Sequence, residues 1–167
     1  MFVFFDLTRN VFLLKVKIIG SLLLAGCLDQ LNFFHFLPIQ PNFAFLTLYF
    51  WSFFFNHYLS FTFVFFFGMF IDLIGGSFLG ENTLCFILLY GSIVFYQEHY
   101  SNDLSLEWRI LWIAIIGLAI FQIILLSLIH HRLILSWGNL VENGFSLMFY
   151  PCLKYALQFL IKERRTP

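Results

Sequence analysis

Long apolar runs, broken by short polar or glycine-containing pieces, dominate the pattern along the chain. The runs are continuous rather than alternating, which favours helices over the strands of a membrane barrel. In a bilayer every backbone polar group needs a partner within the protein, and a helix provides these partners within one segment. We therefore predict six membrane-spanning helices, at about 11–29, 39–56, 58–76, 82–97, 108–129 and 140–161.

The connections between these runs are short. "LPIQP" at 37–41 is a helix-breaking cluster, and "QEHYSNDLSLE" at 97–107 is the clearly polar connection. The runs 39–56 and 82–97 are short for a perpendicular crossing of ~20 residues, so we expect those helices to be tilted or buried among their neighbours. We interpret residues 1–167 as a single polytopic domain, an all-α bundle.

Composition supports a membrane protein. Hydrophobic residues make up 61% of the chain and charged residues 11%, whereas a soluble domain carries about 25% charged residues. The net charge is zero, so we expect membrane lipid as surroundings and no nucleic-acid partner. The four tryptophans fall mostly near predicted span ends, which is typical of an aromatic belt at the membrane interface. They are Trp51, Trp108, Trp112 and Trp137.

Basic residues predict the orientation. Arg9, Lys15 and Lys17 lie toward the N-terminus, and "KERR" at 162–165 lies at the C-terminal end. Six spans put both ends on one side, and lysine and arginine favour the cytoplasmic side. We therefore expect both termini to be cytoplasmic, in a bacterial inner membrane.

The sequence offers little for catalysis or metal binding. Cys27, Cys85 and Cys152 lie in apolar segments without paired spacing, so we expect neither a disulfide nor a metal site. Ser-His-Asp, phosphate-loop and HExxH patterns are missing, and we expect no enzyme activity and no cofactor. "LAGC" at 24–27 looks like a lipoprotein attachment box, but a lipid anchor is redundant beside five more spans.

"GMFIDLIGGSFLG" at 68–80 places a carboxylate inside an apolar run. In a helix Gly68, Asp72 and Gly75 or Gly76 share one face, and glycines let another backbone approach closely. An ionised carboxylate facing lipid would cost about 2.5–3.5 kcal/mol. The face is therefore expected to be a helix–helix contact, with Asp72 facing the bundle, a wet cavity or a partner.

Two roles are open for Asp72. It is a proton or cation relay, or a structural latch that shapes the turn after 75. Depth suggests three partners: Arg132, Asn143 or the backbone amides of 77–82. A relay needs several titratable groups in a line, and the inner half offers no obvious aspartate or glutamate below Asp72. We favour the latch.

The stretch "GMFIDLIGGSFLGENTL" at 68–84 resembles the bacterial rod shape-determining MreD family. That family has a Gly-x-x-x-Asp run, then glycines and a Leu-Gly before the next span. The matching positions are Gly68, Asp72, Gly75 or Gly76, Leu79 and Gly80, and in the last span Asn143 and the pair Tyr150-Pro151. The length and the basic C-terminal end fit the family over the whole chain.

The resemblance implies a non-enzymatic inner-membrane scaffold of peptidoglycan side-wall synthesis, required for rod cell shape. The implied partners are MreC and, through the assembly, MreB, RodA and a penicillin-binding transpeptidase. The implied fold is a six-helix bundle similar to the substrate-binding S-component of energy-coupling-factor vitamin transporters. The alternative is a vitamin-binding transport subunit of that fold, which would need convergent polar groups in an outer-side cavity. Candidate groups are Asp72, Arg132, Glu142 and Asn143.

Overall fold

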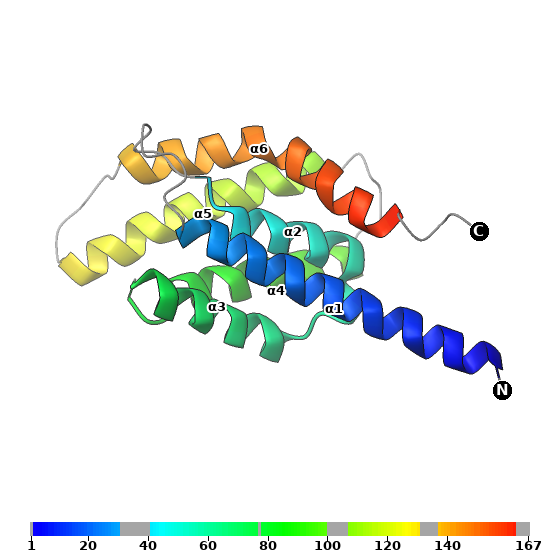
Figure 1. Ribbon diagram of the computed structural model, residues 1–167. Coiled ribbons are helices and arrows are strands. Elements are labelled where there is room, and N and C mark those ends of the chain that lie inside the picture. Colours follow the sequence, from blue (N-terminus) through cyan, green and yellow to red (C-terminus); the bar gives the residue numbers. More distant parts are fainter. Residues whose placement is uncertain (1, 31–40, 77, 100–106, 131–136, 163–167) are drawn as a thin grey trace.

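The described part of the protein is all-helical (Figure 1). The computed structural model describes residues 2–30, 41–76, 78–99, 107–130 and 137–162, and no strand occurs among them. The α-helices are α1 (Phe2–Gln30), α2 (Phe43–Phe55), α3 (Phe61–Gly75), α4 (Glu81–His99), α5 (Glu107–His130) and α6 (Trp137–Lys162), and the 3-10 helix η1 (Asn56–Tyr58) follows α2. One helix lies in each predicted span, which confirms the all-α class and the six helices.

The helices differ in whether they are long and apolar enough to cross a bilayer. Within the described residues, α1 over Val11–Gln30 and α5 over Glu107–Ile124 are long and apolar enough to cross a membrane, and α3 is a shorter apolar helix. At 1.5 Å per residue, the 13 residues of α2 reach about 20 Å, less than the ~30 Å hydrocarbon core. By length and composition, two of the six helices are thus clear candidates for spanning.

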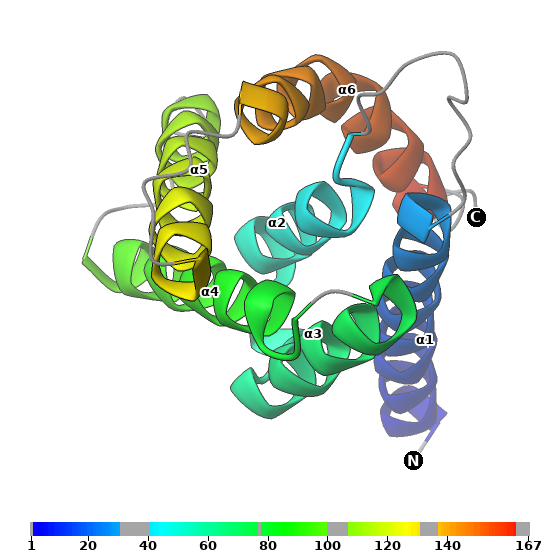
Figure 2. The ribbon, with the colours of Figure 1, turned by 90° about the vertical axis from the view of Figure 1, so that its left-hand side faces the viewer.

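Helix α2 is the core of the bundle. Figure 2 shows it enclosed by the other five helices, and every residue from Ala44 to Ser52 is buried. A helix that is apolar all round is stable when protein surrounds it on all sides. This position explains how so short a helix is accommodated.

The expectation that the tryptophans form a belt at the membrane interface is wrong for Trp51. It is not part of an interface belt, because its side chain is 0% exposed and its indole Nε1 donates a hydrogen bond to Ser21 Oγ on α1 at 2.8 Å. Trp108 and Trp112, on α5, are exposed as a belt requires. The difference arises because α2 is central, which its sequence pattern does not reveal.

Helices α1 and α6 are in contact. Figure 1 shows α1 beginning and α6 ending at the same end of the bundle, and the Lys17 ammonium of α1 donates a hydrogen bond to the Leu160 carbonyl of α6. Helix α6 contains Pro151, which has no N–H to donate within the helix.

Candidate functional site

The α3–α4 turn is built on two glycines with positive φ. Gly76 caps the C-terminus of α3 at φ 63° and Gly80 precedes α4 at φ 104°. Side chains rarely tolerate these values, whereas glycine adopts them readily. A Cβ at either position would meet no heavy atom within 4 Å, so the backbone conformation, not packing, requires glycine there.

Asp72 closes this turn. Its side chain is 1% exposed, and its Oδ2 accepts hydrogen bonds from the Gly80 N–H at 2.8 Å and the Thr83 Oγ1 hydroxyl at 2.7 Å. Its Oδ1 accepts one from the Asn82 N–H at 2.9 Å. The carboxylate thus caps the N-terminus of α4, where free N–H groups and the helix dipole favour a negative charge.

Of the three partners considered for Asp72, the structure shows the turn amides. Arg132 and the side chain of Asn143 lie outside the described part of the chain. The hydrogen bonds join α3 to the start of α4, which is the geometry of a latch. Leu79 and Pro151, which carried part of the family resemblance, are exposed.

Gly68 lets α4 approach α3. A Cβ added there would lie 2.5 Å from the Cα of Thr83, a backbone atom. Gly75 instead faces α1, since a Cβ there would lie 2.9 Å from Gln30 Nε2. Gly76 lies beyond the end of α3. Of the predicted packing face, Gly68 and Asp72 therefore meet α4, whereas Gly75 meets α1.

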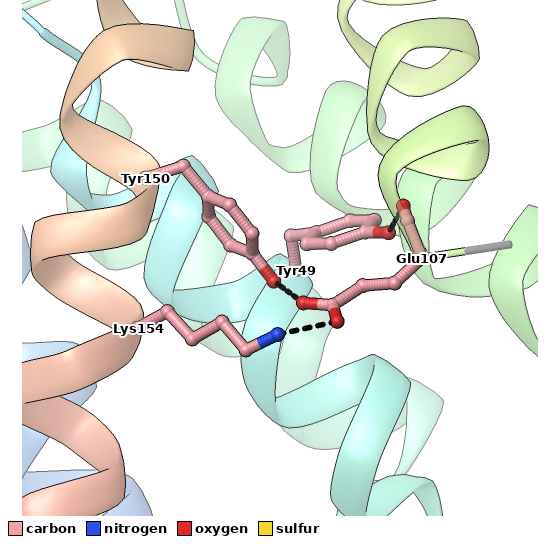
Figure 3. A network of polar contacts seen from close by, with 4 residues as sticks. All are labelled: Tyr49, Glu107, Tyr150 and Lys154. Carbon is pink, nitrogen blue, oxygen red and sulfur yellow. Dashed lines mark hydrogen bonds and ion pairs between the residues drawn. The ribbon is translucent and has the colours of Figure 1, made fainter. Parts of the chain in front are cut away.

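A second buried carboxylate lies at the start of α5 (Figure 3). Glu107 is 2% exposed, and its Oε2 forms an ion pair with Lys154 Nζ at 2.5 Å. The Tyr150 hydroxyl donates to Glu107 Oε1, and the Tyr49 hydroxyl donates to the Glu107 carbonyl oxygen at 2.7 Å. We call Tyr49, Glu107, Tyr150 and Lys154 the Glu107 cluster; it joins α2, α5 and α6.

The Glu107 cluster is not among the features that the sequence predicted. Glu107 ends the polar connection 97–107 and was therefore expected in the loop. The structure instead places it as the first residue of α5, buried and paired with Lys154. Lys154 could have indicated a buried acidic partner from the sequence alone, because a lysine inside an apolar span needs an anion or a route to water.

Asp29 repeats the capping seen at Asp72. Its two carboxylate oxygens accept hydrogen bonds from the N–H groups of Phe43 at 2.7 Å and Ala44 at 2.8 Å. The Asn42 side chain accepts a further one from the Phe45 N–H at 2.9 Å. The last turn of α1 therefore supplies the cap for the N-terminus of α2.

Clefts of different character open on the described surface. An apolar cleft of about 510 Å³ lies between α4 and α5, and its walls are mostly apolar, with Ser92 and Tyr96 as polar members. A polar cleft of about 600 Å³ lies where α2 and η1 meet the last turns of α4. The polar cleft is lined by Phe53, Phe54, Asn56, His57, Leu59, Tyr90, Val94, Gln97 and Glu98.

Metal ligands do not gather in the described residues: no group of three histidine, cysteine, aspartate or glutamate side chains could hold an ion there. The three cysteines are free, with Cys85 buried and Cys27 and Cys152 exposed. The polar side chains that the structure does bring together include the helix caps of Asp29 and Asp72 and the ion pair of Glu107 with Lys154.

Comparison with known proteins gave one family. A family model described as rod shape-determining protein MreD matches residues 10–163. No curated protein and no solved structure matches the chain. The matched range contains the Asp72 turn, the Glu107 cluster and both clefts.

Proposed function

Because the chain belongs to the rod shape-determining protein MreD family, we propose that it is a non-enzymatic scaffold of the side-wall elongation machinery. As a member of this family, the chain is a membrane protein with a role in rod-shape determination. The finer role is to hold MreC and, through the assembly, MreB, RodA and a penicillin-binding transpeptidase together in the inner membrane. The observation that carries this proposal is the family match over nearly the whole chain.

The arrangement of polar and apolar side chains supports a scaffold. The carboxylates of Asp29, Asp72 and Glu107 are turned inward and engaged with backbone N–H groups, hydroxyls or a lysine. Large apolar side chains are turned outward on several helices, among them Leu24 on α1, Leu73 on α3 and Ile113 on α5. Such faces suit lipid and neighbouring helices, and they present no reacting groups.

The proposed topology has six spans with both termini in the cytoplasm. It is supported by the common end at which α1 begins and α6 ends (Figure 1), together with the basic residues near both ends of the chain. The central position of α2 fits a helix too short to cross the bilayer alone.

Vitamin binding is the less favoured function. It would need several polar groups converging in a cavity, and the apolar cleft between α4 and α5 offers the hydroxyls of Ser92 and Tyr96 among apolar walls. Asp72, a candidate ligand for a vitamin, is engaged with the α4 N-terminus. Similarity to the S-component fold stays a prediction of the family resemblance.

The test is depletion of the protein in its own rod-shaped bacterium, with cell length-to-width ratio measured by microscopy. We expect cells to round up and a wild-type copy to restore the rods. An Asp72→Ala copy, compared at equal membrane abundance, measures what the latch contributes. Cells that keep their rod shape without the protein would overturn the scaffold function.

A further inference from the structure

We propose that the apolar cleft between α4 and α5 binds one acyl chain of a membrane phospholipid, whose headgroup lies where α4 ends and α5 begins. The proposal goes beyond the scaffold function and depends only on the chain being a membrane protein. It assigns the cleft a class of ligand, and it gives that ligand an orientation relative to the bundle.

The apolar cleft is elongated along one pair of helices. Helices α4 and α5 run in opposite directions (Figure 1), and the cleft follows α5 from Ile110 to Ile124. At 1.5 Å per residue this stretch is about 21 Å long, longer than one leaflet of the ~30 Å hydrocarbon core. It lies within the part of α5 that is long and apolar enough to cross a membrane. The cleft therefore runs nearly parallel to the lipid chains around it.

The walls of the cleft leave a space that an apolar chain would fill. A Cβ added to Gly117, in the α5 wall, would meet no heavy atom within 4 Å. The floor is buried, since Phe45 of α2 is 2% exposed and Leu89 of α4 is 4% exposed. The rim is aliphatic and open, with Leu88 and Ile113 exposed. Atoms that line an unfilled space lose dispersion contacts, so a chain from the bilayer is stabilised there.

The end of the cleft where α4 ends and α5 begins is suited to a headgroup. Tyr96 lines the cleft there, and Trp108 and Arg109 are exposed in the first turn of α5. Tyrosine and tryptophan favour the headgroup level of a membrane, and an arginine side chain extends its charge toward the same level. Of the acidic residues described nearby, Glu107 is paired with a lysine and Glu98 lines the polar cleft instead. A lipid phosphate can therefore lie at this end with its tail in the cleft.

The size of the cleft favours a lipid chain over a helix of a partner protein. A helix with its side chains is about 10–12 Å wide, so a length of about 21 Å occupies roughly 1,600 Å³ or more. The cleft holds about 510 Å³, which is about a third of that volume. An acyl chain carries no side chains, so it enters a narrow cleft without moving α4 away from α5.

The experiment is native mass spectrometry of the full chain, delipidated in detergent and then titrated with phosphatidylethanolamine. We expect one phospholipid to bind with an affinity above that of any further ones. Gly117→Phe places a ring in the cleft and should weaken this binding about tenfold. Gly20→Phe is the matched control, because Gly20 is an exposed glycine of α1 whose added Cβ also meets nothing within 4 Å. Its affinity for the lipid should be unchanged.

A second pair of variants keeps the test decisive if Gly117→Phe fails to fold. Leu88→Trp enlarges a side chain at the rim of the cleft, and Leu24→Trp makes the same change at an exposed leucine of α1. We expect Leu88→Trp to weaken lipid binding and Leu24→Trp to leave it unchanged. Circular dichroism of each variant measures whether the helices are retained.

Three outcomes would overturn the proposal. The wild-type chain could bind no phospholipid above the background of the detergent. Folded cleft and control variants could weaken binding equally, which would indicate lipid spread over the whole apolar surface. A photoreactive benzoylphenylalanine at Leu88 could crosslink in cells to a protein rather than to phospholipid, which would identify the cleft as the site of a partner. Lipid binding is measured without reference to cell shape, so the scaffold function is tested separately.

Discussion

Asp72 and Glu107 are both buried carboxylates in apolar helices, yet they stabilise the protein over different distances along the chain. Asp72 bonds residues 8, 10 and 11 positions away. Glu107 is bonded by Tyr150, Lys154 and Tyr49, which lie 43, 47 and 58 positions away. The first closes one hairpin, and the second holds three helices together.

The two sites also differ in what balances the charge. Backbone N–H groups at the α4 N-terminus and one hydroxyl surround the Asp72 carboxylate, whereas a lysine and a tyrosine meet the Glu107 carboxylate. Loss of an Asp72 contact should therefore open the α3–α4 turn locally. Loss of the lysine leaves a buried charge without its counterion and should weaken the bundle as a whole.

The largest effect is expected for Lys154→Met. It leaves the buried Glu107 carboxylate without its cation, and we expect the free energy of unfolding to fall by about 3 kcal/mol. The measurement is unfolding of the detergent-solubilised protein by dodecyl sulfate titration. Lys15→Met, the same change at an exposed lysine of α1, is the control and should shift stability little. Equal effects of the two variants would show that the ion pair does not hold the helices.

Asp72→Ala should cost about 2 kcal/mol, because buried N–H groups lose an ionised acceptor. The loss should be local. Hydrogen exchange should accelerate at the amides of Gly80, Asn82 and Thr83 and stay unchanged in α6. Acceleration spread evenly over α3–α6 would contradict the division between a hairpin latch and a cluster that joins three helices.

Gly68→Ala should destabilise the protein by about 1.5 kcal/mol, since its Cβ would meet the Thr83 backbone and push α4 away. The same unfolding titration measures it. Gly117→Ala on α5 is the matched control, because a Cβ there meets nothing within 4 Å. That variant should be neutral or slightly stabilising, as alanine is the better helix former.

The smallest effect is expected for Thr83→Val, about 1 kcal/mol. It removes the hydroxyl that donates to Asp72 and keeps the shape and the backbone N–H. Hydrogen exchange at the Gly80 amide should change less than in Asp72→Ala. A larger change in Thr83→Val would show that the Thr83 hydroxyl contributes more to the stabilisation of the turn than the turn amides do.

The sequence by itself determined the features that depend on neighbouring residues. Apolar runs and their breaks located six helices, with ends within four residues of the structure except at the start of α1, which begins at Phe2 rather than near residue 11. The spacing of Gly68 and Asp72 placed both on one packing face, and the cost of a charge in lipid turned Asp72 inward. The turn amides, within eleven positions of Asp72, were accordingly among the partners considered.

Only the tertiary structure decided which helix is central and which distant side chains meet. Nothing in the apolar pattern of α2 distinguishes a lipid-facing helix from one enclosed by five others, so Trp51 was placed at the interface although Ser21 binds it in the core. The capping of α2 by Asp29 and the pairing of Glu107 with Lys154 depend in the same way on how the helices are arranged. Periodicity is a property of one helix, whereas these contacts depend on the packing of several.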